Sequence, residues 1–368
     1  LPAEAVHAVR LAKTIGAFEI TGSPFNLPCT VQLVRYAVGN PAYDEAVALL
    51  SQEKMVYRSK VTDELRLVEP TDIDIEREIE EWASKDPRGF SLDRLVELGI
   101  QHYVIPHKYN HEEKITRFLT PLYVNMENLE VALPMVRLPR ELDGLDGIIC
   151  YMFPEDENQQ TRLREVAATC SDSRIVFALP EEPVPLTQAL KRFLALSELV
   201  EVLPSKTQDP RVERLLALYL DDAKESLTLE LSKVTNPSGN VEYYREGEQR
   251  RIETRKQLSE LASEMMYGLY SKAPRINNEL INKHSPTVTS RRARNQVIDE
   301  LLKGSRGVRG RLRSSQEEFM FDTLFVNTGL YDEEREQFAV SEPCERVMAA
   351  FDAFFTETRN GPRTFRDL

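Results

Sequence analysis

Between residues 102 and 203, short apolar runs alternate with helical stretches, and this pattern limits the folds that the chain can adopt. The runs that predict strands lie at 102–106, 115–124, 147–153, 174–179 and 199–203. Helical patterns fill 157–169 and 186–196. Strands that alternate with helices through short connections are typical of a parallel sheet. We therefore expect an α/β domain over residues 90–205 with a mostly parallel sheet, in which the 115–124 strand pairs antiparallel at one edge.

Residues 1–86 predict a helical domain that ends in a hairpin. A helical stripe runs over 3–17, Thr30 is a cap for a helix over 31–38, and 43–52 predicts another short helix. Residues 55–58 and 64–68 predict two strands joined by a polar turn. This is the order of elements in a winged helix, with 43–52 as the recognition helix.

The local basic residues are Lys54, Arg58, Lys60 and Arg66, and the first three are candidates for nucleic-acid contact. Asp44 and Glu45 begin the expected recognition helix, and carboxylates face phosphates unfavourably. A winged helix that serves only for packing is therefore the alternative interpretation.

An acidic helix over 73–82 and a linker over 85–89 separate this domain from the α/β domain. The remaining residues, 206–368, predict a helical domain. Asp209 followed by Pro210 is a typical helix start, and apolar residues recur every three or four positions up to Val234. A second long helix is expected over 247–270, antiparallel to the first. The whole chain is thus expected to be an α+β protein of several domains.

The chain carries no motif for catalysis, cofactor binding or metal binding. It has no Gly-x-x-x-x-Gly-Lys-Ser/Thr loop for nucleotide phosphates. His102, His107 and His111 lack the convergent spacing of a zinc site. The four cysteines are scattered, as in proteins of a reducing cytosol, so a cytoplasmic location is expected. No apolar run approaches the roughly 20 residues of a membrane span.

The basic segment 283–313 is the sharpest local anomaly. The chain has a net charge of −13, which argues against nucleic acid coating its whole length. This segment nevertheless holds nine basic residues and only two acidic ones. Its basic residues are Lys283, Arg291, Arg292, Arg294, Lys303, Arg306, Arg309, Arg311 and Arg313. The hypotheses are contact with nucleic-acid phosphates, an acidic protein partner or self-association, and a solvated loop.

The helix within this segment is expected to begin after Ser290 as its cap. Its apolar face would comprise Val297, Ile298 and Leu301. Three arginines would then fan out from its first turn, where the helix dipole disfavours cations unless an anion is present.

Several stretches together carry a family resemblance: Ala-Val-Arg-Leu-Ala-Lys-Thr-Ile-Gly-Ala at 8–17, Tyr57-Arg58 followed by Leu-Arg-Leu-Val-Glu-Pro-Thr-Asp-Ile-Asp-Ile at 65–75, Pro-Arg-Ile-Asn-Asn-Glu-Leu-Ile-Asn-Lys at 274–283, and the Ala-Arg pattern of 290–301. Their order resembles the region downstream of the ATPase core in large bacterial P-loop ATPases of anti-phage and restriction systems, the BREX-type ATPases and their relatives. The resemblance implies an ATPase module that precedes this region. Because this chain lacks a P-loop, ATP and Mg²⁺ are assigned to that module and no cofactor to this chain.

The resemblance also implies other defence-system subunits as partners. Leu1 falls within an amphipathic pattern, so we expect a segment of a longer polypeptide. The preferred hypothesis is a non-catalytic region that couples nucleotide state to nucleic-acid or protein binding. The alternatives are a stand-alone winged-helix regulator with an α/β ligand-sensing domain, and an enzyme with its site near 154–158 and 180–183, where strands of the sheet end.

Overall fold

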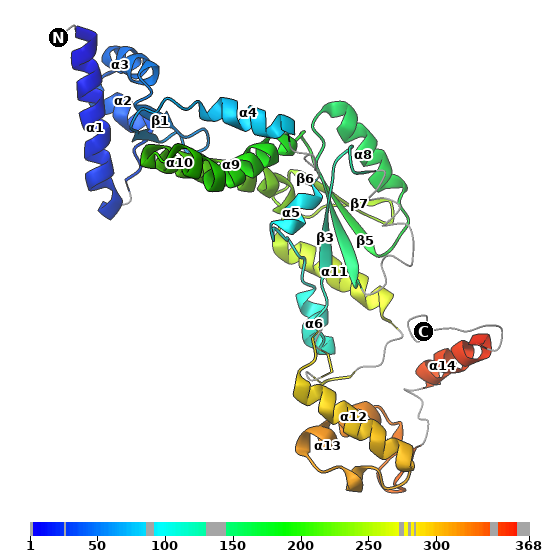
Figure 1. Ribbon diagram of the computed structural model, residues 1–368. Coiled ribbons are helices and arrows are strands. Elements are labelled where there is room, and N and C mark those ends of the chain that lie inside the picture. The colour runs from blue at the N-terminus through cyan, green and yellow to red at the C-terminus, as the bar shows by residue number, and fades with distance from the viewer. Residues whose placement is uncertain are drawn as a thin grey trace. The chain divides into compact units, whose positions relative to one another are not determined.

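The structure, a computed structural model, describes residues 3–25, 27–85, 92–129, 145–271, 276–278, 281–282, 285–338 and 345–358 (Figure 1). The chain divides into two compact units. Unit 1 comprises Leu1–Arg94 and Pro183–Lys233, and unit 2 comprises Leu95–Glu182 and Val234–Leu368. Both units are therefore built from segments that are distant in the sequence. Among the helices of the described ranges, none has the length and apolarity needed to cross a membrane.

The first part of unit 1 follows the predicted order of helices and hairpin. Its elements are α1 (Ala3–Phe25), α2 (Val31–Val38), α3 (Asn40–Gln52), β1 (Val56–Arg58) and β2 (Leu65–Leu67). The hydroxyl of Thr30 caps α2, as expected, by accepting from the backbone N–H of Leu33. The two strands pair antiparallel, and an isolated bridge joins Thr30 to Glu64 beside them. Leu11, Ile15 and Leu65 are fully buried in the shared core.

The second part of unit 1 packs three helices together: α4 (Ile75–Lys85), α9 (Leu186–Thr207) and α10 (Pro210–Thr235). The expected strand at 199–203 is wrong, because Leu196, Leu199 and Leu203 recur at helical spacing and bury one face of α9. Only Gln208 and Asp209 separate α9 from α10, and both helices contribute to one core. The two helices that form a helical hairpin are therefore α9 and α10. The expected helical hairpin paired residues 210–234 with 247–270.

Unit 2 is built on a five-stranded mixed sheet in the order β3-β4-β5-β6-β7. The strands are β3 (Leu119–Val124), β4 (Gly147–Met152), β5 (Ile175–Pro180), β6 (Val241–Arg245) and β7 (Glu248–Arg250). The first three are parallel, whereas β6 and β7 pair antiparallel. The sheet is thus mixed instead of mostly parallel, and the expected antiparallel pairing of 115–124 is wrong. The expected strand at 102–106 is reduced to one bridge, Val104 to Leu119.

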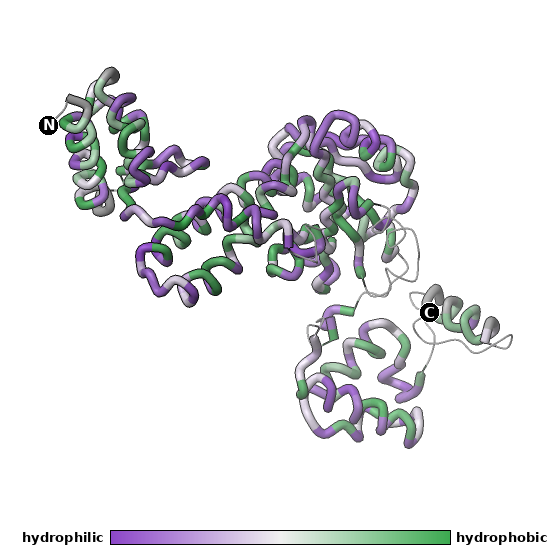
Figure 2. Tube along the Cα trace, turned by 45° about the horizontal axis from the view of Figure 1, so that its top comes forward, coloured by the Kyte–Doolittle hydropathy of each residue, from purple (hydrophilic) through white to green (hydrophobic). Residues whose placement is uncertain are grey.

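Helices cover the sheet on both faces. Helix α8 (Glu157–Thr169) places Leu163 and Ala167 in a core with one side of β4 and β5, and Figure 2 shows the hydrophilic residues along the rest of this helix. Gly147 lies under α11 (Arg255–Leu269), where an added Cβ would lie only 2.2 Å from Met265 Cε. The expected helix over 247–270 therefore begins later, because residues 241–250 form a hairpin and Thr254 caps α11.

The other elements of unit 2 are α6 (His107–Glu113), α12 (Val288–Lys303), the 3-10 turn η1 (Arg309–Arg311), α13 (Ser315–Phe321), the π-helix η2 (Asp322–Val326), β8 (Tyr331–Asp332), β9 (Gln337–Phe338) and α14 (Glu345–Glu357). The short helix α5 (Asp93–Glu97) spans the boundary between the two units. Most of the expected linker at 85–89 lies outside the described residues, as do Lys283 and Pro274.

Candidate nucleic-acid interface

Helix α12 carries the centre of the basic segment and is fixed by its buried face. Its cap is Thr287, whose hydroxyl accepts from the backbone N–H of Ser290 at 3.2 Å. Ser290 itself is buried in the first turn, so the expected cap is wrong by one turn. Val297 packs in a small core with residues of the following elements: Val308, Leu312, Phe321 and Tyr331. This packing positions the opposite face of α12 toward solvent.

The exposed face of α12 combines cations with apolar side chains. Arg291, Arg292 and Arg294 are exposed in the first two turns. Ile298 is 45% exposed, which corrects its expected place in the buried face, and Leu302 is 81% exposed. The sequence spacing could have indicated this exposed apolar pair, because residues four positions apart lie on the same face of a helix.

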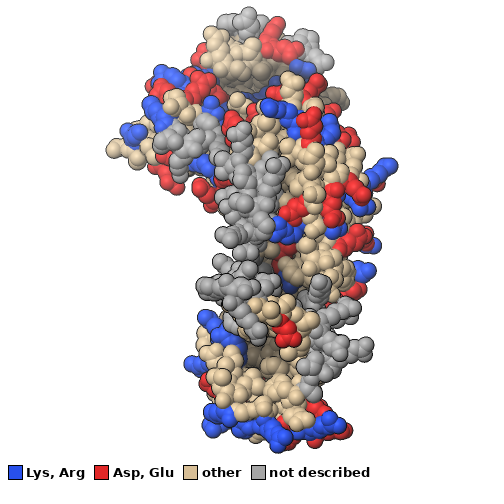
Figure 3. All heavy atoms as spheres, turned by 90° about the vertical axis from the view of Figure 1, so that its right-hand side faces the viewer, with Lys and Arg blue, Asp and Glu red and all other residues tan. Residues whose placement is uncertain are grey.

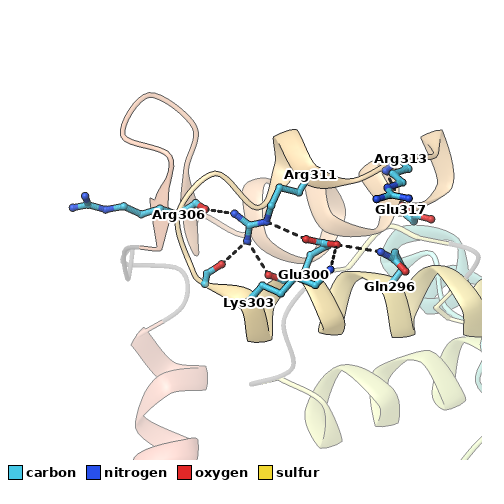
Figure 4. Close-up of polar contacts among 8 residues, drawn as sticks. Gln296, Glu300, Lys303, Arg306, Arg311, Arg313 and Glu317 are labelled. Atoms are coloured by element: carbon cyan, nitrogen blue, oxygen red, sulfur yellow. Dashed lines mark hydrogen bonds and ion pairs between the residues drawn. The ribbon is translucent and has the colours of Figure 1, made fainter.

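The side chain of Arg311 hydrogen-bonds the backbone at the C-terminal end of α12 and so has a structural role (Figure 4). Its guanidinium donates to Glu300 Oε2 at 3.0 Å and to the backbone carbonyl of the same residue at 2.8 Å. It also donates to the carbonyl oxygens of Gly304 and Arg306, both at 2.6 Å. A helix leaves its last carbonyl groups without intrahelical partners, and this one side chain satisfies two such groups and the adjoining loop.

Glu300 is the buried centre of this cluster. Its side chain is only 4% exposed and accepts from Lys303 at 2.7 Å and from Gln296 at 3.2 Å, in addition to Arg311. The hydrogen bonds from Lys303 and Arg311 hold the pKa of the Glu300 carboxyl below its ordinary value. The charged form of Glu300 is therefore the one that the fold stabilises.

This depressed pKa makes the C-terminal segment sensitive to acid. A carboxyl whose pKa is lower in the folded state contributes stability above its ordinary pKa, and that contribution is lost as the pH falls through the folded value. We expect hydrogen exchange of the α12 amides to accelerate between pH 5 and pH 3, after correction for the intrinsic exchange rate. Glu300→Gln should flatten this dependence, and an equally steep dependence in that variant would contradict the assignment.

Arg309 is also engaged. It donates to Asp322 at 2.8 Å and pairs with Glu333. Within the described residues, five other arginines of the segment have no carboxylate partner, and we call them the unpaired arginines. They are Arg291, Arg292, Arg294, Arg306 and Arg313. The side chain of Arg294 is oriented by hydrogen bonds to Asn295 Oδ1 at 3.1 and 3.3 Å.

Figure 3 shows Lys and Arg side chains along the lower edge of the view, in the part of unit 2 that contains α12 and α13. The structure thus divides the nine basic residues of the segment into three groups. Lys303, Arg309 and Arg311 are paired, the unpaired arginines face solvent, and Lys283 lies outside the described residues.

The N-terminal candidates are not gathered into such a surface. Arg58 pairs with Asp63, and the Lys60 ammonium lies 3.9 Å from Glu76. Lys54 is exposed just after α3. Acidic neighbours thus offset two of these three candidates.

The turn of the hairpin is bound to helix α10 of the same unit. The Ser59 hydroxyl donates to Asp222 Oδ1, and the backbone N–H of Lys60 donates to Asp222 Oδ2 at 3.3 Å. Asp222 is only 7% exposed. The Ser59 oxygen in turn accepts from the backbone N–H groups of Val61 and Thr62. This end of the hairpin is therefore a packing contact.

Asp222→Asn should lower the free energy of unfolding of unit 1 by about 1–2 kcal/mol, because it weakens two hydrogen bonds to a buried charge. Trp82, the single tryptophan, packs in the same unit and reports the transition by fluorescence. Asp221→Asn is the matched control, since Asp221 is the exposed neighbour. Equal stability losses in the two variants would show that the hairpin contact contributes nothing.

Comparisons with protein-family models, with curated protein sequences and with solved structures found no significant match to this chain.

Proposed function

We propose that this chain binds nucleic acid through the unpaired arginines. The observation that supports the proposal is the contrast within one short segment. Arg309 and Arg311 are engaged by carboxylates, whereas five neighbouring arginines have none among the described residues. Exposed cations that lack carboxylate partners can neutralise phosphates without breaking an ion pair first.

The net charge of the chain restricts nucleic-acid contact to a small part of its surface. At −13 the chain as a whole repels a polyanion, so only a surface where cations outnumber acids can bind one. Arg311 and Glu300 fix the loop that follows α12, and Arg306 projects from that loop. A fixed loop loses little conformational entropy on binding, which favours affinity.

The wider proposal rests on the resemblance to BREX-type ATPases. In that reading the chain is a non-catalytic region that transmits the nucleotide state of an ATPase module elsewhere in the polypeptide. ATP and Mg²⁺ would belong to that module.

Residues 27–68 are part of the same proposal as a winged helix that packs instead of reading DNA. The order α2-α3-β1-β2 and the bridge from Thr30 to Glu64 support the winged-helix assignment. The contact of the hairpin with Asp222 supports the packing role. Helix α3 begins at Asn40, three residues before the expected start, which places Asp44 and Glu45 in its second turn. Carboxylates on this helix give little basis for sequence-specific contact with base edges.

A protein partner is the second candidate, favoured by the apolar side chains on the same helix. Val288 is 59% exposed, and Ile298 and Leu302 extend the apolar surface. Arginine together with exposed aliphatic residues is common in protein interfaces.

The double variant Ile298→Ser/Leu302→Ser separates the two candidates. Binding to a labelled 20-base-pair DNA is measured by fluorescence anisotropy in about 0.1 M salt, and self-association by sedimentation velocity. If nucleic acid is the partner, the double variant should retain its DNA affinity within about twofold, because apolar groups add nothing to phosphate contacts. Absence of DNA binding by the wild type, together with self-association that the double variant loses, would overturn the proposal in favour of a protein surface.

A further inference from the structure

A cavity of about 650 Å³ lies in unit 2, away from α12. Its walls come from residues 101–108, from Tyr151 near the carboxyl end of β4, and from the first turns of α11. This volume lies within the usual range for small-molecule sites. The loops at 154–158 and 180–183, where the enzyme alternative expected a site, do not line this cavity.

Hydrogen bonds and ring contacts hold the walls in place. The Tyr151 hydroxyl donates to the backbone carbonyl of His102 at 3.1 Å, and Tyr151 stacks on Tyr123 with 5.8 Å between ring centroids. The His102 ring contacts the Tyr123 hydroxyl at 2.8 Å. On the other wall, Ser259 donates to the carbonyl of Ile105 at 2.6 Å. These contacts fix the walls of the cavity around the buried Tyr151 of the sheet.

The charged residues of the lining are three cations, Lys108, Arg255 and Lys256, and one acid, Glu260. Among the described residues, Lys108 and Arg255 have no carboxylate partner. Arg255 is held by a hydrogen bond to Asn236 Oδ1 at 2.5 Å. The acid of the lining, Glu260, lies 3.8 Å from Lys256 and offsets that lysine only. The amino end of α11 adds a partial positive charge.

The apolar side chains of the lining are exposed enough to contact a ligand. Tyr103 and Ile105 are each 44% exposed, although both lie on the wall of a cavity. Leu258 contributes from α11. The lining thus combines cations with an aromatic ring and aliphatic groups, a combination complementary to a ligand that carries both an anionic group and a flat apolar group.

We propose that this cavity binds a small phosphorylated molecule of mononucleotide size, with its phosphate at Arg255 and Lys108 and its apolar part against Tyr103 and Ile105. The proposal is independent of the nucleic-acid surface, because it uses none of the unpaired arginines.

Isothermal titration calorimetry tests the site. The full chain is titrated with AMP, with inorganic phosphate and with adenosine. AMP should bind at least tenfold more tightly than either fragment, because only AMP occupies both ends. Arg255→Gln and Lys108→Gln should each weaken AMP binding about tenfold and leave adenosine binding unchanged. Arg251→Gln is the control, since Arg251 is an exposed arginine outside the cavity lining.

Circular dichroism of each variant establishes that it is folded, and Lys108→Gln, at an exposed position, keeps the test valid if Arg255→Gln unfolds. AMP binding that is absent at millimolar concentration would overturn the proposal. So would AMP binding that Arg251→Gln weakens as much as the cavity variants. A variant with Arg291, Arg292 and Arg294 replaced by Gln should bind AMP like the wild type. This result would keep the test separate from the nucleic-acid proposal.

Discussion

Arg311→Ala is expected to unfold the end of α12 and the loop that follows it. The substitution removes three hydrogen bonds to backbone carbonyl groups and one to a buried carboxylate. At about 1.5 kcal/mol for each bond from a charged donor to a carbonyl, the three carbonyl contacts alone contribute about 4.5 kcal/mol. Hydrogen exchange over residues 288–338 should then approach the rate of an unprotected chain, while the sheet of unit 2 stays protected.

Arg311→Lys separates the role of the charge from that of the guanidinium. A lysine keeps the cation, but its single ammonium cannot reach acceptors on Glu300, Gly304 and Arg306 together. We therefore expect most of the loss of protection to persist in Arg311→Lys. Arg313→Ala is the matched control, because that side chain is exposed and only its backbone N–H bonds Glu317. Normal protection in both Arg311 variants would show that the cluster does not hold the loop.

The triple variant Arg291→Gln/Arg292→Gln/Arg294→Gln is expected to lose DNA affinity by a factor of about several hundred in 0.1 M salt. Each phosphate contact on duplex DNA changes the logarithm of affinity by about 0.9 for each tenfold change in salt, so three contacts account for nearly three powers of ten relative to 1 M salt. The loss should be the same for DNA of any sequence, since phosphates carry no sequence information directly.

A second triple variant controls for the change in net charge. Arg162, Arg250 and Arg251 are exposed arginines of unit 2 that lie outside α12. Their replacement by Gln lowers the net charge by the same three units and should reduce affinity only slightly. Equal losses in the two triple variants would mean that net charge, and not the α12 surface, governs binding.

Much of the local structure could be predicted from the sequence. The Thr30 cap, α2, the β1–β2 hairpin and α8 follow their expected bounds closely, because capping residues and periodicity are local signals. The strand expected at 199–203 failed because a short apolar run fits a buried helix as well as a strand. Strands β6 and β7 were missed because Val241–Arg245 is short and mixed in polarity, and its place in the sheet depends on distant pairing with β5.

The candidate surface was only partly predictable. Composition identified the basic segment, but it cannot separate the paired arginines from the unpaired ones. That distinction depends on Glu300, Asp322 and Glu333, of which the last two lie beyond the segment in the sequence. The cavity also depends on the tertiary fold, since Lys108 and Arg255 are far apart in the chain and meet only around the sheet.

The salt dependence of DNA binding shows whether the arginines of α12 contact phosphates. Affinity of the wild type and of the Arg291→Gln/Arg292→Gln/Arg294→Gln variant is measured by anisotropy between about 0.05 and 0.3 M salt, with the control triple variant alongside. We expect the slope of log affinity against log salt to be shallower by about three units in the α12 variant and to change little in the control. Identical slopes for the wild type and the α12 variant would contradict it.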